Sequence, residues 1–267
     1  MTEQTQKPRR TYVVKSDEAP TRTLEKGLFL LSLFDNEHPE WSLKELQERS
    51  GFSKATTRRL VKTLEATKWL AYDPSSRTYH LGSSALRVLY LATSHSELVR
   101  IVHPSLVKLA KETNESAIFS VWTDQGALII DTAPSSRPFK PVTYPGMLLP
   151  GVGSADAQVL IAFGPEENWD VILSGPIERR TERTVTDPAA LRERWRRVRQ
   201  EGVAYDWGEW NLGAPAVSAP VFDGTGQLRG SVTVVAPIER CSEEQMQQYA
   251  LAVKKAAAEI SKKLSPH

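Results

Sequence analysis

Apolar residues in the first third of the chain recur at the three- and four-residue spacing of helices that bury one face. Over residues 23–34 this spacing predicts a helix whose inward residues are Leu24, Leu28, Leu30, Leu31, Leu33 and Phe34. Two more helices are expected over residues 42–64. The first of this pair should bury Leu43 and Leu46, and the second should bury Leu60, Val61 and Leu64.

Polar residues mark where this helix pair begins and turns. Ser42 and Glu45 have the spacing of a capping box, in which the hydroxyl and the carboxylate each accept a hydrogen bond from a backbone amide. Gly51 favours the left-handed conformation that ends a helix, and Ser53 is placed to cap the next one. The pattern therefore predicts two short helices joined by a tight turn.

The outward face of the second helix of the pair is cationic and rich in hydroxyl groups, with Lys54, Thr56, Thr57, Arg58, Arg59, Lys62 and Thr63. In the DNA major groove, arginine and lysine pair with guanine edges, and threonine contacts phosphate oxygens or thymine methyl groups. Taken alone, the segment allows two interpretations: a DNA-reading helix, or the solvated face of an ordinary helical hairpin.

Two short alternating runs, residues 69–72 and 78–81, flank a turn-forming cluster and predict a β-hairpin. Three helices followed by a hairpin make a winged helix-turn-helix over residues 21–81, which favours DNA reading, with the hairpin tip along the DNA backbone or minor groove. The residues expected to contact DNA are Ser42, Lys44, Ser53, Lys54, Ala55, Thr56, Thr57, Arg58, Arg59, Lys62 and Arg77.

Residues 82–97 predict a linker helix with Leu86, Leu89 and Tyr90 on one side. A helix this apolar would expose a hydrophobic patch to water if it stood alone. We therefore expect it to pack against a second subunit and form a homodimer or, by pairing of dimers, a homotetramer. The alternative is that it packs on its own chain. In a dimer, two recognition helices would read two half-sites of an operator.

The pattern changes to mixed α and β from residue 98 onward. Strands are expected at 116–122, 127–131, 215–222 and 228–236, and helices at 104–113, 158–163 and 242–264. Strands grouped in hairpins indicate an antiparallel sheet in an α+β sandwich and not a doubly wound parallel sheet. The fold class is thus mixed α/β in two domains, the first mostly helical.

Composition adds little to this picture. The 267-residue chain has a net charge of +2, and residues 1–81 hold 14 Lys/Arg against 11 Asp/Glu. Residues 1–20 are expected to be a disordered basic tail, which either makes weak contacts to DNA phosphates or has no role in binding. No apolar run approaches the roughly 20 residues of a membrane span and no signal-peptide pattern is present, so we expect a cytoplasmic protein. One cysteine, scattered histidines and the lack of nucleotide-binding motifs predict no disulfide, metal or cofactor.

The runs TRTLEKGLFLLSLF and SLKELQERSGFSKATTRRLVKTLEATKWLAYDPSSRTYHLGSSAL resemble the N-terminal domain of IclR-type transcriptional regulators. The specific matches are the glycine of the turn, the Lys-x-Thr that opens the recognition helix, the arginine before its leucine and the YHLG exit from the wing. The resemblance covers nearly all of residues 21–265. It implies a linker helix, a GAF-like effector-binding domain over 98–267, and a regulator that binds operator DNA and a small organic effector.

A glycine-rich stretch, residues 144–157, leads into an apolar helix whose free amides predict an anion site, for example for a carboxylate. The resemblance places the effector against this loop, at Ser154, Ala155 and Asp156. Most relatives carry a small or apolar residue where Asp156 stands. Its carboxylate is therefore expected either to cap the helix or to contact a ligand hydroxyl or amine.

A second cluster, residues 205–210, corresponds to a region that borders the pocket in relatives, and Asp206, Glu209 and Trp210 are its candidates. Trp210 and Trp122 are expected either to stack on an aromatic ligand or to pack in the core. The resemblance adds Ala216 and Thr233 to the effector-binding set. More indole and fewer hydroxyls suggest an effector larger and more apolar than a two- or three-carbon acid.

The arginine-rich run 191–199 is interpreted as the solvated face of an amphipathic helix that buries Leu191, Trp195 and Val198.

Two other functions are alternatives to a regulator. An enzyme finds no support, because no nucleophile and base are arranged in sequence and neither His103 nor Cys241 has an evident partner, so no catalytic residue is proposed. The other is a DNA-binding oligomer that responds to no ligand.

Overall fold

The computed structural model describes residues 21–35, 38–94 and 96–265. The chain divides into two compact units, residues 1–95 and 96–267, which are treated separately below. The basic tail predicted over residues 1–20 lies outside the described residues. Within the described part, no helix is both long enough and apolar enough to cross a membrane.

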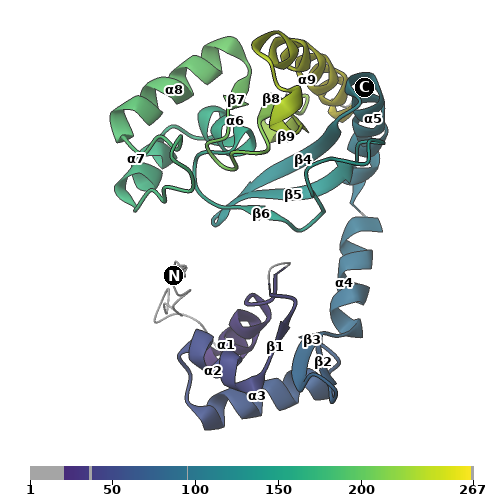
Figure 1. Cartoon of the computed structure of the whole chain (residues 1–267), viewed down its shortest axis with the longest axis vertical. Coiled ribbons are helices and arrows are strands. Elements are labelled where there is room, and N and C mark those ends of the chain that lie inside the picture. Colours follow the sequence, from purple (N-terminus) through teal and green to yellow (C-terminus); the bar gives the residue numbers. More distant parts are fainter. Residues whose placement is uncertain (1–20, 36–37, 95, 266–267) are drawn as a thin grey trace. The chain divides into compact units, whose positions relative to one another are not determined.

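The N-terminal unit has the predicted order of three helices and a hairpin (Figure 1). Its elements are α1 (Arg22–Leu31), β1 (Glu40–Trp41), α2 (Leu43–Ser50), α3 (Lys54–Ala66), β2 (Leu70–Asp73), β3 (Thr78–Leu81) and α4 (Ser83–Ser94). The hairpin is joined by β1, so that a three-stranded antiparallel sheet has the order β1-β3-β2. The two-residue strand β1 was not predicted, because it is too short to show an alternating pattern.

The core of this unit includes or contacts four of the six residues of the 23–34 run that were predicted to face inward, Leu30, Leu31, Leu33 and Phe34, but not Leu24 or Leu28. Gly27 and Leu30 of α1 are buried and Leu33 follows them into the core, whereas Leu24 and Leu28 are 61% and 55% exposed. The helix ends at Leu31, three residues before the predicted end. Apolar residues occupy more than one side of this helix, so their spacing alone could not select the buried side.

The linker helix α4 has an apolar exposed surface, as its sequence predicted. Leu86 and Tyr90 are 68% and 69% exposed, and Val88, Leu89 and Leu91 are also exposed. The Ser84 hydroxyl near its start donates a hydrogen bond of 2.8 Å to the carbonyl oxygen of Thr67, which ties the start of α4 to the end of α3.

The C-terminal unit is built on a six-stranded sheet of order β6-β5-β4-β9-β8-β7, in which every pairing is antiparallel. The antiparallel α+β fold is therefore confirmed. Its elements are α5 (Glu97–Thr113), β4 (Ser116–Thr123), β5 (Gly126–Ala133), β6 (Leu148–Leu149), α6 (Ala155–Phe163), α7 (Glu167–Ser174), α8 (Pro188–Glu201), β7 (Ala204–Asp206), β8 (Ala216–Phe222), β9 (Leu228–Val235), a 3-10 turn (Ile238–Arg240) and α9 (Glu243–Leu264).

Helices cover both faces of this sheet (Figure 1). On one face α5 and α9 bury a core with Leu106, Phe119, Val232 and Val253. On the other face α6 packs on the sheet and α7 and α8 pack outside it, around Trp169 and Trp195. The helix predicted to begin at Pro104 begins at Glu97, because Ser96 caps it and the proline is accommodated inside. The elements β6, α7 and β7 were not predicted.

Candidate functional site

The helix pair of the N-terminal unit has the caps that its sequence predicted. The Ser42 hydroxyl accepts from the Glu45 amide at 3.2 Å, while the Glu45 carboxylate accepts from the Ser42 amide at 2.8 Å. Hydrogen bonds from the hydroxyl and the amide of Ser42 to the Glu45 carboxylate lower the pKa of Glu45. Gly51 has φ +70°, and the Ser53 hydroxyl accepts from the Thr56 amide at 3.3 Å. The turn between α2 and α3 is thus fixed at both sides.

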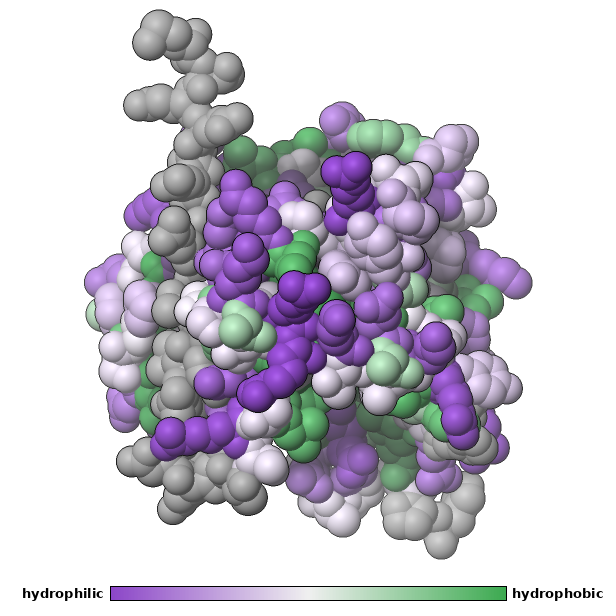
Figure 2. Space-filling model, turned by 90° about the horizontal axis from the view of Figure 1, so that it is seen from below, coloured by the Kyte–Doolittle hydropathy of each residue, from purple (hydrophilic) through white to green (hydrophobic). Residues whose placement is uncertain are grey.

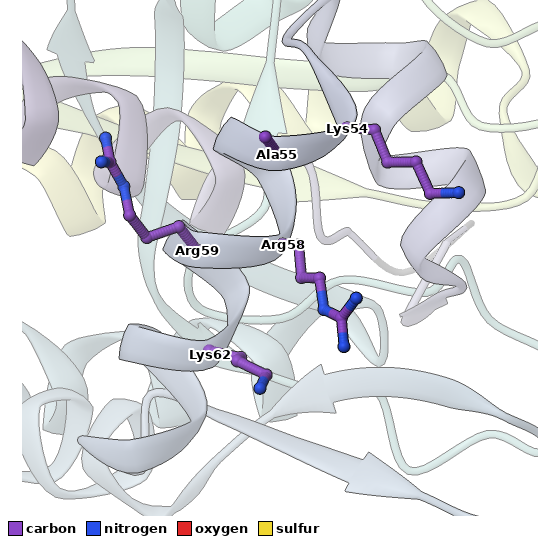
Figure 3. Close-up of a pocket in the computed structure, with 5 residues that line it drawn as sticks. All are labelled: Lys54, Ala55, Arg58, Arg59 and Lys62. Atoms are coloured by element: carbon purple, nitrogen blue, oxygen red, sulfur yellow. The ribbon is translucent and has the colours of Figure 1, made fainter.

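Five exposed residues of α3 line a hollow of about 590 Å³: Lys54, Ala55, Arg58, Arg59 and Lys62. Lys54, Arg58 and Lys62 are four residues apart and extend from one side of the helix, and Arg59 extends from the other (Figure 3). No ion pair among the described residues involves any of these four cations. Hydrophilic residues cover much of the centre of the face that is seen from below in Figure 2.

One residue predicted for the DNA-contacting face lies in the core instead. Thr57 is fully buried, and its hydroxyl donates a hydrogen bond of 3.2 Å to the carbonyl oxygen of Ser53. Its assignment to the outward face was wrong, because Thr57 is on the same stripe of α3 as Leu60, Val61 and Leu64.

The remaining predicted DNA contacts have mixed surroundings. Ser42 and Ser53 act as helix caps, and the Thr56 hydroxyl lies 3.0 Å from that of Ser53. Lys44 is exposed and lies 3.8 Å from the Glu48 carboxylate. These hydroxyl groups therefore already serve the backbone, whereas the cations of α3 do not.

The tip of the hairpin is ordered by hydrogen bonds of its own. The Asp73 carboxylate accepts from the Ser75 amide at 2.8 Å and from its hydroxyl at 2.6 Å, which lowers the pKa of Asp73. Arg77 has φ +60° and its side chain is exposed. The Thr78 hydroxyl donates to Glu40 at 2.8 Å, which fastens the hairpin to β1.

The C-terminal unit contains a cavity of about 390 Å³. Five of the nine predicted effector-binding residues line it: Ser154, Asp156, Asp206, Trp210 and Ala216. The others that line it were not predicted: Ile118, Ile129, Phe139, Lys140, Pro141, Val142, Thr143, Met147, Leu149, Asn211, Gly213, Ala214, Val235 and Pro237. Strand alternation signals which face Ile118 and Ile129 share, but residues 139–143 carry no pattern that places them here.

Asp156 is not the cap of α6. Ser154 is the cap, since its hydroxyl accepts from the Ala157 amide at 3.2 Å. Asp156 lies in the first helical turn, is 2% exposed, and accepts from the Thr233 hydroxyl at 2.8 Å. Burial raises its pKa, against the lowering effect of its hydroxyl partners. The capping alternative is therefore wrong, and the predicted anion site already has a carboxyl group of this chain beside it.

Thr233 does not line the cavity itself but contacts Asp156, which does. It is fully buried, does not line the cavity, and lies 2.8 Å from both the Asp156 carboxylate and the Ser218 hydroxyl. Ala155 is also buried outside the cavity lining, next to Ala216 and Val235. Thr233 thus positions Asp156.

Asp206 organises the turn that carries Trp210. Its Oδ1 accepts from the amides of Gly208 at 2.8 Å, Glu209 at 2.6 Å and Trp210 at 3.4 Å. Gly208 has φ +94°, a conformation that side chains disfavour, which explains a glycine at this position. Burial raises the pKa of Asp206 to about 7 despite the amide donors.

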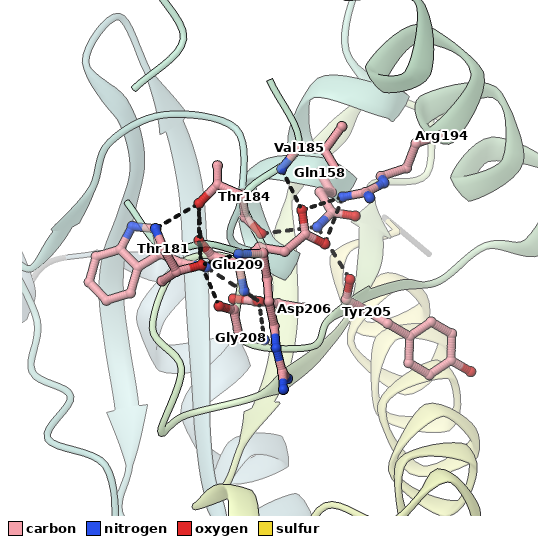
Figure 4. Close-up of polar contacts among 12 residues, drawn as sticks. Gln158, Thr181, Thr184, Val185, Arg194, Tyr205, Asp206, Gly208 and Glu209 are labelled. Atoms are coloured by element: carbon pink, nitrogen blue, oxygen red, sulfur yellow. Dashed lines mark hydrogen bonds and ion pairs between the residues drawn. The ribbon is translucent and has the colours of Figure 1, made fainter. Parts of the chain in front are cut away.

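Glu209 does not line the cavity, and its side chain joins this turn to Arg194 of α8 (Figure 4). Its carboxylate, 9% exposed, accepts from Arg194 at 2.6 and 2.7 Å. The Thr184 hydroxyl donates to the Glu209 carbonyl oxygen at 2.7 Å. Glu209 therefore holds the loop in place, and it does not line the predicted pocket.

The interpretation of the α8 arginines as a solvated face was wrong for three of them. Arg194 pairs with Glu209, Arg192 pairs with Asp170, and Arg199 pairs with Glu166. The acids belong to α7, to the residue before it and to the loop after β7. Helix α7 was not predicted and Glu209 was assigned to the pocket, so the pairing was not foreseen.

Trp122 and the two residues weighed for catalysis lie outside the cavity lining. Trp122 is 37% exposed, so neither the stacking nor the core-packing interpretation describes it. His103 Nδ1 lies 3.1 Å from both carboxylate oxygens of Asp131. Burial raises the pKa of Cys241 to about 11, which disfavours the reactive thiolate. Among the described residues, no group of three His, Cys, Asp or Glu side chains is arranged to hold a metal.

Comparison with known proteins shows the family. Residues 90–262 match the model of the bacterial transcriptional regulator IclR C-terminal domain, and residues 23–74 match that of the IclR helix-turn-helix domain. The regulator BhcR of Paracoccus denitrificans is 28% identical, with 94% of this chain and 90% of BhcR aligned. Rv1719 of Mycobacterium tuberculosis is 30% identical over 74% of this chain and 76% of its own length.

Solved structures agree. A putative IclR regulator from Silicibacter is 26% identical with a TM-score of 0.80, covering 91% of this chain and 96% of that one. An IclR homolog from Microbacterium hydrocarbonoxydans, solved in complex with 4-hydroxybenzoate, shares the fold at 20% identity, with a TM-score of 0.74 and coverage of 91% and 98%. The chain belongs to the IclR family: it is a DNA-binding transcriptional regulator and not an enzyme.

Proposed function

We propose that this regulator reads operator DNA with the cationic face of α3 and changes its operator affinity when a small organic effector occupies the cavity of the C-terminal unit. The observation that carries the first half is the set of exposed cations on α3, Lys54, Arg58, Arg59 and Lys62, without acidic partners in the described structure. Such cations are available to guanine edges and phosphates.

The hairpin and the α2 start complete the proposed DNA surface. Arg77 at the ordered hairpin tip would contact the backbone or minor groove, and Lys44 and Ser42 would approach phosphates from the start of α2. Because Thr57 is buried, it has no place in this surface. Bacterial DNA is cytoplasmic, and we place the action of the protein there.

The exposed apolar residues of α4 support a dimer. Leu86 and Tyr90 are more than two-thirds exposed, at 68% and 69%, and monomers rarely leave several large apolar side chains of one helix in water. A second copy would cover them and bring two α3 helices to two half-sites. Pairing of such dimers into a tetramer is the further step that we propose for the assembled regulator.

The cavity supports an effector with an aromatic or otherwise apolar body. Its volume of about 390 Å³ falls in the range of roughly 300–1,000 Å³ that is typical of ligand pockets. Its walls combine apolar residues with Trp210 and a few polar groups, which suits a partly apolar molecule. A related fold holds 4-hydroxybenzoate, a ligand of comparable character.

Ligand binding would act as a coupling between the two units. An effector that binds one arrangement of the paired DNA-binding domains better than another shifts the population toward that arrangement, and so changes operator affinity. The direction of this change, repression or activation, follows from which arrangement the operator prefers.

The test begins with a DNA duplex that the wild-type protein selects from random sequence. Gel-shift titrations of Lys54→Ala and Arg58→Ala should each show weaker binding by about tenfold or more, whereas Arg197→Ala on α8 should bind like the wild type. If both α3 variants bind like the wild type, the recognition-helix assignment is wrong. If a broad metabolite panel produces no thermal shift and no change in DNA binding, the effector half fails.

A further inference from the structure

Two buried carboxyl groups line the cavity without a cationic partner among the described residues. Asp156 and Asp206 are each 2% exposed, and no ion pair formed by the described residues includes either of them. Buried acids in proteins are usually paired with a cation or a metal. Asp156 and Asp206 depart from this rule among the described residues.

The partners that these carboxyl groups do have are neutral. Asp156 accepts from the Thr233 hydroxyl at 2.8 Å and, at 3.5 Å, from that of Ser231. Asp206 accepts from three backbone amides. Burial raises the pKa of both groups, to about 7 for Asp206, so these donors do not compensate the loss of water.

Lys140 is the single cationic side chain among the described residues that line the cavity, and it forms no ion pair with Asp156 or Asp206. It is exposed, and its ammonium group donates a hydrogen bond of 2.7 Å to the Ser135 carbonyl oxygen. Its neighbours Phe139 and Val142 are 68% and 77% exposed, so this segment is the exposed part of the cavity lining. The buried charged groups of the described lining are the two acids.

The start of α6 does not favour a ligand carboxylate either. Its first turn already has the Ser154 hydroxyl as cap and the Asp156 carboxyl beside it. A second anion there would face a like charge at short range in a region shielded from water, which costs free energy.

We infer that the effector is a small organic cation, a protonated amine on an aromatic or apolar body, whose ammonium group lies between Asp156 and Asp206 while the body packs on the apolar walls. This rests on the proposed function, in which this cavity binds the effector. The three N–H donors of an ammonium group match carboxylate acceptors, and the walls that include Ile118, Ile129 and Leu149 match the body.

Three ligands of similar shape and different charge test the cationic-effector inference on the wild-type protein. The probes are 2-phenylethylamine, 2-phenylethanol and phenylacetate, measured by isothermal titration calorimetry at pH 8 and by thermal shift. The amine should bind about tenfold or more tightly than phenylacetate, with the alcohol between them. Tighter binding of phenylacetate than of the amine overturns the inference and leaves an organic effector intact as a proposal.

Asp156→Asn identifies the carboxyl group responsible, because asparagine keeps the shape and an oxygen acceptor for Thr233 but removes the charge. It should lose about tenfold or more of the amine affinity and lose the preference for amine over acid. The matched control is Asp170→Asn, an acid on α7 that is 76% exposed and outside the cavity lining, which should bind all three probes like the wild type.

Three results contradict the inference. They are amine affinity unchanged in Asp156→Asn, an equal loss in Asp170→Asn, and no binding of any probe to the wild type. In the last case the proposed function is judged separately, on a wider panel of acids, neutral compounds and amines that is scored for thermal shift and operator affinity. Only failure across that panel removes the effector itself. The wild-type series keeps the test valid if the variant unfolds.

Discussion

Two helices of this protein carry dense positive charge, and their surroundings give that charge opposite roles. On α3, the four cations Lys54, Arg58, Arg59 and Lys62 have no acidic partner in the described structure. On α8, three of five arginines are paired with acids from other segments. Composition does not distinguish the two helices. Pairing does, because a neutralised cation no longer offers its charge to a phosphate.

The two helices also differ in what their charges do for the fold. Removing a cation from α3 leaves no buried acid behind, so folding should be nearly unaffected. Removing Arg194 from α8 leaves the Glu209 carboxylate, 9% exposed, without its partner and unsettles the turn that carries Trp210. We therefore propose that charge on α3 serves recognition, whereas the Arg194 charge on α8 holds the turn that carries Trp210.

Arg194→Ala is the largest perturbation that separates these roles. It should lower the free energy of unfolding by roughly 3 kcal/mol, the lower end of the range for breaking a buried pair, since the arginine is 26% exposed. Urea denaturation measures this loss. Arg196→Ala, which removes a more exposed arginine of the same helix, is the control and should change stability by less than about 0.5 kcal/mol. Equal losses of stability in the two variants would mean that the Arg194–Glu209 pair contributes no more to stability than an exposed arginine does.

Asp206→Asn tests the same turn through its pH dependence. The pKa of Asp206 is raised from 3.8 to about 7 in the folded protein, so the fold binds this proton more tightly than the unfolded chain does. The group therefore favours the folded state at low pH, and this contribution declines as pH rises from about 4 to about 7. Asparagine keeps the acceptor oxygen and does not titrate.

The expected result is that Asp206→Asn becomes more stable relative to the wild type at pH 8 than at pH 5. Denaturation of both proteins at the two pH values measures the difference. A difference that is the same at pH 5 and pH 8, or that grows in the opposite direction, would show that Asp206 is already ionised in the fold at low pH.

Thr57→Val is the smallest perturbation and tests which residues of α3 reach DNA. Thr57 is buried, and its hydroxyl bonds only within the first turn of α3. The variant should lose about 1 kcal/mol of stability or less and keep operator affinity within about twofold. Chemical denaturation and a gel-shift titration measure the two quantities. A tenfold loss of operator affinity in a folded variant would return this residue to the DNA-contacting set.

Local signals were predictable from the sequence, and distant pairings were not. The capping box of Ser42 and Glu45, the Gly51 turn and the strand pairs of the C-terminal sheet depend on residues a few positions apart, and the structure has them as predicted. The exposure of Leu24 and Leu28 and the burial of Thr57 were misjudged, because apolar spacing did not fix the edges of the buried face.

The ligand cavity was predicted only in part for a related reason. Asp206 and Trp210 were found because acids and aromatics are concentrated in six residues, and Ser154 and Asp156 because a helix starts beside them. Lys140 and the segment around it reach the cavity through a long connection without periodic pattern. The Arg194–Glu209 pair joins a helix to a loop 15 residues later, and nothing local signals that contact.

The central claim is that unpaired charge on α3, and not positive charge in general, binds the operator. The direct measurement is fluorescence anisotropy with the selected duplex and two double variants that each remove two positive charges. Arg58→Ala with Lys62→Ala on α3 should weaken binding by about a hundredfold, and Arg196→Ala with Arg197→Ala on α8 should leave it within about twofold. Equal losses in the two double variants would contradict the claim.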